Sequence, residues 1–205
     1  MKAFWSIALI AATLALTSCG GGEEATASPE ETPAATTEGQ PAQPQLNAPQ
    51  QQQPAGAWRT FADADFQIRY PGEWQLNANS QFGAAFELYA PSNQQDGFAE
   101  NINLIKQGLN GQTIALQDYA AISIQQIQKV VDNSNVLASG IYNNGANDYF
   151  EIVYTGGQGQ LLLKWRQHFY VQDTTAYVLT YSAQQNSFDQ HNTQATAIMS
   201  SFRLQ

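Results

Sequence analysis

Four segments of alternating apolar and polar residues occupy positions 135–183, and only short turns separate them. Parallel neighbouring strands need crossover connections of a dozen or more residues, whereas antiparallel strands are joined by short turns rich in glycine, asparagine and aspartate. The pattern predicts an antiparallel meander. Its strands are expected at 135–142, 147–155, 160–172 and 175–183, joined through Asn143-Asn144-Gly145, Gly156-Gly157-Gln158-Gly159 and Asp173-Thr174.

Shorter strands and two helices complete the predicted domain. Strands are expected at 66–70, ended by Pro71-Gly72, and at 83–90 and 101–107, followed by a turn at Asn110-Gly111. Apolar residues at helical spacing predict one helix over 114–132, with Thr113 as its N-cap, and a second helix from Ser187, where Ser187 and Gln190 match a capping box. The predicted fold class is therefore α+β, an antiparallel β-sheet with helices packed on it.

The N-terminus has the form of an export signal. Lys2 precedes an apolar run to Thr17 that is too short to span a bilayer. Leu16-Thr17-Ser18-Cys19 resembles a bacterial lipobox, which implies cleavage after residue 18 and lipid on Cys19, the single cysteine. The alternative is an ordinary signal peptide with a chance cysteine. Gly20 is not acidic, which favours sorting to the outer membrane over retention at the inner membrane.

A low-complexity segment separates Cys19 from the predicted domain. Residues 20–57 hold six of the eight prolines and five acids without a base, so this segment cannot bury enough apolar surface to fold. We therefore divide the chain into a signal peptide (1–18), a disordered tether (19–57) and a folded domain (58–205). The domain carries 12 acids and 7 bases without a basic run, which argues against a nucleic-acid partner.

Several short motifs resemble PsbP-like and DcrB-like domains. The resemblance implies an α/β/α sandwich without a catalytic site, in a superfamily that includes photosystem II accessory proteins and periplasmic lipoproteins. It does not identify a partner, because members share a fold and not a function. The motifs are Phe66-Gln67-Ile68-Arg69-Tyr70-Pro71-Gly72-Glu73-Trp74, Asn101-Ile102-Asn103, Leu116-Gln117-Asp118-Tyr119, Tyr177-Val178-Leu179-Thr180-Tyr181 and Ile198-Met199-Ser200-Ser201-Phe202.

The sequence contains few residues that could carry chemistry. It has no Gly-x-Ser-x-Gly elbow, phosphate-binding loop or His-Glu-x-x-His zinc motif, so we expect no catalytic residue, metal site or cofactor. His191 lies on the apolar stripe of the last helix, and we expect it to pack there. In the strand 160–172, one face is positive and is expected to be exposed. This candidate binding patch consists of Lys164, Arg166, His168 and Tyr170.

These features predict a non-catalytic domain held at a cell-envelope membrane by lipid on Cys19, in the periplasm or at the cell surface. Its expected partner is another envelope protein. The alternatives are an envelope hydrolase using Asp/Glu and His, a small-molecule or metal carrier, or, in a photosynthetic bacterium, a photosystem II accessory protein. A cleft that holds a histidine beside a carboxylate would favour the hydrolase, and a large apolar pocket would favour the carrier.

Overall fold

The computed structural model describes residues 56–80, 83–91 and 98–205. The predicted signal peptide, the predicted lipidation site Cys19 and all but the end of the predicted tether lie outside the described residues. Within the described ranges, no helix has the length and apolar character needed to cross a membrane.

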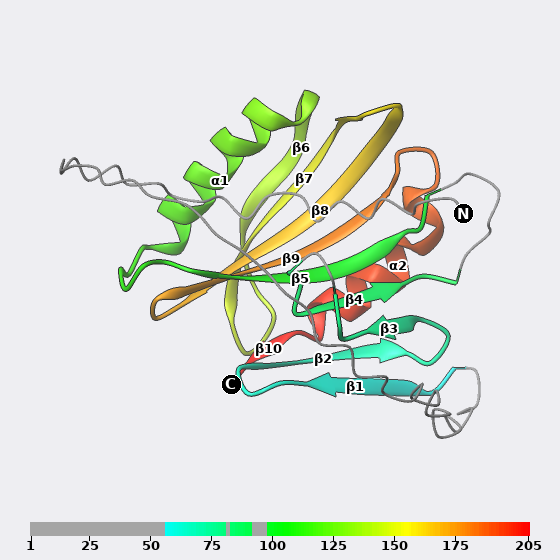
Figure 1. Cartoon of the computed structure of the whole chain (residues 1–205), viewed down its shortest axis with the longest axis horizontal. Coiled ribbons are helices and arrows are strands. Elements are labelled where there is room, and N and C mark those ends of the chain that lie inside the picture. The colour runs from blue at the N-terminus through cyan, green and yellow to red at the C-terminus, as the bar shows by residue number, and fades with distance from the viewer. Residues whose placement is uncertain (1–55, 81–82, 92–97) are drawn as a thin grey trace, which may run out of the picture. The chain divides into compact units, whose positions relative to one another are not determined.

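A seven-stranded antiparallel sheet forms the centre of the fold (Figure 1), in the order β3-β4-β5-β9-β8-β7-β6. The meander predicted from the short turns is confirmed, because β6 to β9 pair in sequence order. The strands are β3 (Gln75–Asn77), β4 (Phe86–Tyr89), β5 (Asn101–Gly108), β6 (Asp132–Asn143), β7 (Asp148–Gln158), β8 (Leu161–Gln172) and β9 (Thr175–Gln184).

A smaller sheet packs beside the first. It consists of β1 (Trp58–Ala62), β2 (Phe66–Pro71) and β10 (Arg203–Leu204), with β2 in the middle and antiparallel to both neighbours. The strand at 66–70 was predicted, but β1, β3 and β10 were not. β3 and β10 are three and two residues long, too short for an alternating pattern to be read.

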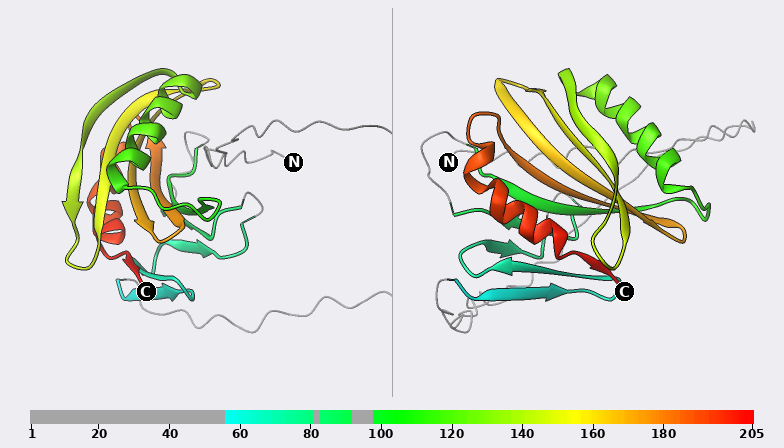
Figure 2. Two further views of the ribbon diagram at one scale, coloured as in Figure 1. Left: turned by 90° about the vertical axis from the view of Figure 1, so that its left-hand side faces the viewer. Right: turned by 180° about the vertical axis from the view of Figure 1, so that it is seen from behind.

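The two helices cover opposite faces of the large sheet, which confirms the α+β class (Figure 2). Helix α1 (Leu116–Val130) packs Tyr119, Ala120 and Ile127 against one face. Helix α2 (Phe188–Ser200) packs Phe188, Ala195, Ile198 and Met199 against the other face, together with the small sheet. Trp74, Trp165 and Tyr181 are among the aromatic residues buried in the core.

Three local predictions were wrong. Ala115, not Thr113, is the N-cap of α1, and no side chain caps that helix. The Ser187 side chain does not form the predicted capping box, because its Oγ donates to Glu100 Oε1 at 2.6 Å. The glycine run is not all turn: Gly156 and Gly157 pair with Leu163 and Leu162 within β7 and β8, and the turn follows at Gly159.

Candidate functional site

The predicted binding patch lies on the α2 face of the sheet and is largely covered. Its four residues do share one face of β8, as the alternation predicted. The expected exposure was wrong, because His168 and Tyr170 are only 2% and 0% exposed, while Lys164 and Arg166 are half-buried. Helix α2 lies over Arg166 and Lys164, and the aromatic rings of Tyr149 and Phe202 cover His168 and Tyr170.

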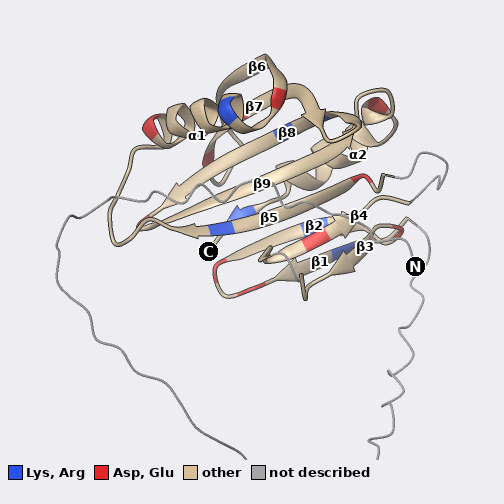
Figure 3. Cartoon of the chain, turned by 45° about the horizontal axis from the view of Figure 1, so that its top comes forward, with Lys and Arg blue, Asp and Glu red and all other residues tan. Residues whose placement is uncertain are grey.

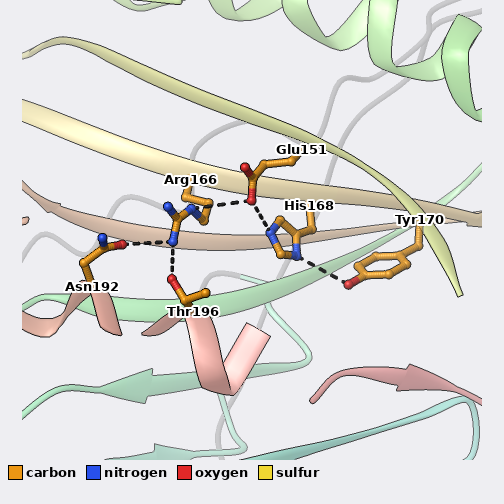
Figure 4. Close-up of polar contacts among 6 residues, drawn as sticks. All are labelled: Glu151, Arg166, His168, Tyr170, Asn192 and Thr196. Carbon is orange, nitrogen blue, oxygen red and sulfur yellow. Dashed lines mark hydrogen bonds and ion pairs between the residues drawn. The ribbon is translucent and has the colours of Figure 1, made fainter. Parts of the chain in front are cut away.

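Glu151 turns this patch into an ion-pair cluster. The antiparallel register places Glu151 of β7 directly opposite His168 of β8, and Glu151 Oε2 lies 2.8 Å from His168 Nε2 (Figure 4). Sequence reasoning missed Glu151. The sequence carries a signal for it, because pairing β7 with β8 through a short turn fixes which residues face each other.

A hydrogen bond sets the charge state of Glu151, and burial sets that of His168. The hydrogen bond from His168 lowers the pKa of Glu151 below its usual value, and this outweighs the effect of desolvation. Burial lowers the pKa of His168, against the opposing pull of Glu151. At neutral pH the carboxylate is therefore charged and the imidazole neutral, which places the ring proton on Nε2, where it is donated to Glu151.

The other imidazole nitrogen faces a tyrosine. Tyr170 Oη lies 3.5 Å from His168 Nδ1, which is unprotonated in this tautomer and can accept from the hydroxyl. Tyr149 stacks on the imidazole with ring centroids 4.2 Å apart. Burial raises the pKa of both tyrosines, so each stays a neutral phenol. The result is a carboxylate–imidazole–phenol chain across β7 and β8.

Arg166 joins this chain to α2. Its Nε lies 3.5 Å from Glu151 Oε2, close enough for an ion pair but without hydrogen-bond geometry. Its Nη1 donates to Asn192 Oδ1 at 2.9 Å and to Thr196 Oγ1. Lys164 lies over the Phe188 ring, with Nζ 4.2 Å from its centroid. Both cations of the predicted patch are thus held against α2.

The cluster has the composition of a proton relay but lacks an opening to its centre. A nucleophile or general base must reach substrate, and neither His168 nor Tyr170 is accessible. A cavity of about 260 Å³ lies elsewhere, between the end of α1 and the β7–β8 turn, and is lined by Val130, Val131, Asp132, Gly157, Gln158, Gly159 and Trp165. That volume is below the range of typical ligand pockets.

The remaining candidates are structural. His191 is half-buried and packs edge-on against Trp74, with ring centroids 6.2 Å apart, as predicted for a packing histidine. The part of the chain that the structure describes contains no cluster of three or more metal-ligating side chains. Figure 3 shows the lysines and arginines scattered over several elements instead of gathered on one.

Solved structures with this fold come from several bacteria. LpqN of Mycobacterium tuberculosis, described as involved in cell envelope biogenesis, aligns with a TM-score of 0.58 at 12% identity over 72% of this chain and 91% of its own. CyanoP of Synechocystis sp. PCC 6803 aligns with a TM-score of 0.50 at 12% identity, over 73% and 94%. PA94 of Pseudomonas aeruginosa aligns with a TM-score of 0.51 at 13% identity, over 71% and 95%.

These identities are low enough that the alignments establish the fold alone. No curated protein is significantly similar to the chain in sequence. The model of the PsbP-like protein family, however, matches residues 33–204, which begins inside the predicted tether and covers the whole described domain. The chain therefore belongs to the PsbP-like protein family.

Proposed function

We propose that this protein is a non-catalytic binding or assembly module of the cell envelope. The PsbP-like fold and the likeness to LpqN, which is described as involved in cell envelope biogenesis, support this setting. The observation that carries the proposal is the burial of His168, which forms the one histidine–carboxylate pair found among the described residues. His168 lies 2.8 Å from a carboxylate, which suits a hydrolase, but it is 2% exposed beneath packed aromatic rings.

The cluster serves the fold instead of a substrate. Arg166 and Glu151 hold α2 and β7 to β8 through charge-assisted hydrogen bonds and an ion pair, which fix the geometry of this face. The solvent-facing rim of the cluster consists of Glu151, Arg166, Asn192 and the exposed Thr196. We propose this rim as the surface that contacts an envelope partner.

A photo-crosslinking amino acid at Thr196 tests this surface in intact cells. Thr196 is exposed on α2, and Gln128, exposed on α1 across the sheet, is the matched control position. The expected result is a discrete crosslinked protein from position 196 and none from position 128. If the two positions gave the same products, the rim would not be the contact surface.

We further propose that lipid on Cys19 holds the protein to a membrane, with the outer membrane preferred. The variant Cys19→Ser should move the full-length chain from the membrane fraction to the soluble fraction, because one thioether is the attachment point for the lipid. The matched control is Ser18→Ala, which changes the neighbouring side chain and retains the thiol. A Cys19→Ser protein that stayed with membranes would contradict the anchor without affecting the proposed rim.

A further inference from the structure

Three of the six exposed large apolar side chains of the described residues lie on β6. These are Leu137, Ile141 and Tyr142, which are 51%, 49% and 47% exposed. The others are Val130, at the end of α1 and two residues before β6, Leu162, at the start of β8, and Trp58 of β1. Exposed apolar side chains grouped in this way mark interaction surfaces more often than isolated ones do.

β6 is an edge strand of the large sheet, so one side of its backbone has no strand partner among residues 56–80, 83–91 and 98–205 (Figure 2, left). Exposed edges are usually protected by charged side chains, proline or bulges. The first half of β6 has such protection, with register shifts between Asp132 and Asn135 and between Val136 and Ala138. The second half, residues 138–143, pairs with β7 without interruption and contains no charged residue or proline.

We propose that this regular half of β6 pairs antiparallel with β6 of a second copy of the chain, with Gly140 on the two-fold axis. In this register Ala138 lies opposite Tyr142 of the second copy, and Ser139 lies opposite its Ile141. Each large side chain thus meets a small one. The symmetric contact brings no charge against a like charge, although the domain is acidic overall.

The side-chain packing on the α2 face favours a strand at this edge. The Tyr142 ring lies over Gly140, with Cε2 3.3 Å from the position of a Cβ there, and stacks on Tyr149 with ring centroids 5.8 Å apart. Tyr149 in turn stacks on His168. This ladder of rings ends at Tyr142, which remains 47% exposed, and in the proposed register the Ala138 side chain of the second copy would pack beside it.

A second copy fits this edge better than the chain's own tether does. Proline recurs through residues 29–54, and each proline removes a backbone donor that strand pairing requires. Pairing over five residues buries less than the ~800 Å² per partner of stable complexes, so the contact should be weak in dilute solution. It is therefore tested by covalent trapping. This edge of the sheet is a different surface from the rim proposed to contact an envelope partner.

The test co-expresses two full-length chains with different tags, Ala138→Cys in one and Tyr142→Cys in the other, followed by oxidation with copper phenanthroline. Opposed residues have Cα atoms about 4.5–5.5 Å apart, which suits a disulfide. We expect a disulfide dimer that carries both tags. Neither variant alone should form it, since like positions are offset by four residues, or about 13 Å.

Ser139→Cys with Tyr142→Cys is the matched control. Ser139 is as exposed as Ala138 but faces the other side of the sheet. Every variant in the experiment and its control retains Cys19, so any crosslink through Cys19 appears in all of the samples. Absence of the dual-tag dimer, or an equally strong one in the Ser139→Cys arm, would overturn the proposal.

A second variant tests the surface itself. Ile141→Lys in both chains places two ammonium groups diagonally across the two-fold axis, and we expect it to reduce the dual-tag dimer on the order of tenfold. Ile141 is half exposed, so the fold should tolerate the change. Gln128→Lys adds the same charge on α1 and should leave the dimer unchanged. An undiminished dimer with Ile141→Lys would also refute the pairing.

Discussion

Glu151 Oε2 lies 2.8 Å from His168 Nε2, across the β7–β8 pair and under a layer of aromatic rings. The pKa of each partner is lowered, that of Glu151 mainly by the hydrogen bond and that of His168 mainly by burial. In both cases the unfolded chain binds a proton more readily than the folded one. Stability must therefore rise with pH wherever either group titrates.

This linkage predicts a loss of stability in mild acid that depends on His168. The unfolded imidazole protonates below about pH 6.5, while the buried one resists, so the free energy of unfolding should fall between pH 7 and pH 5 by up to about 1.4 kcal/mol per pH unit. The lowered pKa of Glu151 adds a further loss below about pH 4.3. Urea unfolding at pH 7, 6 and 5 measures the slope.

His168→Gln should flatten this slope, whereas His191→Gln should not. His191 is the matched control because it is the other histidine of the chain and is only half-buried. The comparison uses the change with pH and not the absolute stability, since either substitution can cost stability for other reasons. The same slope in His168→Gln and the unmodified protein would show that the imidazole does not resist protonation.

Arg166 is predicted to stabilise the attachment of α2 to the sheet. Its Nη1 donates to Asn192 and Thr196 of α2. Arg166→Met removes these hydrogen bonds and should lower the free energy of unfolding by about 1–2 kcal/mol. The loss should be smaller than for a fully buried charge, because the Arg166 side chain is 17% exposed. Arg166→Lys should lose part of this, since an ammonium lacks the planar fork. Lys129→Met, on an exposed part of α1, should stay within a few tenths of a kcal/mol, and an equal effect there would refute this role.

The meander could be predicted from the sequence because the signals for it lie close together along the chain. Period-two alternation gave the strands, and short turns such as Asp173-Thr174 left antiparallel pairing as the single option. The same alternation correctly placed Arg166 and His168 on one face of β8. It could not tell that this face is covered, because the covering helix is joined to the sheet by contacts 26 and 30 residues distant in sequence.

Residues with distant partners account for two of the other errors. Ser187 has the sequence of a capping residue, but its hydroxyl bonds Glu100, 87 residues away. Gly156 resembles a turn residue, but it is in β7 because Val131 and the Asp132 backbone lie against it. In both positions a contact set by the fold outweighs a preference set by the neighbouring sequence.

Gly156 should therefore not tolerate a side chain. A Cβ there would overlap Val131 Cγ1 and lie 3.0 Å from the Asp132 carbonyl oxygen, which is backbone and cannot move aside easily. Gly156→Ala should lower the free energy of unfolding by about 1–3 kcal/mol, measured by urea unfolding. Gly108→Ala is the control, because nothing lies within 4 Å of a Cβ at the end of β5. Equal stabilities for the two variants would show that the residues at the α1–β6 junction move aside to make room for the added methyl group.

The Ser187–Glu100 hydrogen bond should stabilise the start of α2. Ser187 and Glu100 are 5% and 7% exposed, and the 2.6 Å bond joins the first turn of the helix to the loop before β5. Ser187→Ala leaves a buried carboxyl group without this donor, so we expect a loss of about 1–3 kcal/mol. Glu100→Gln retains an acceptor oxygen and should cost less.

A double-mutant cycle of Ser187→Ala and Glu100→Ala isolates this bond from the other effects of each substitution. The coupling energy should reach about 1 kcal/mol, since the two side chains are in direct contact. Ser200→Ala, at the other end of α2, controls for the loss of a serine hydroxyl from the helix. Additive single effects, with no coupling, would mean that solvent replaces the bond and that α2 is held by its other contacts, such as the buried Phe188, Ile198 and Met199.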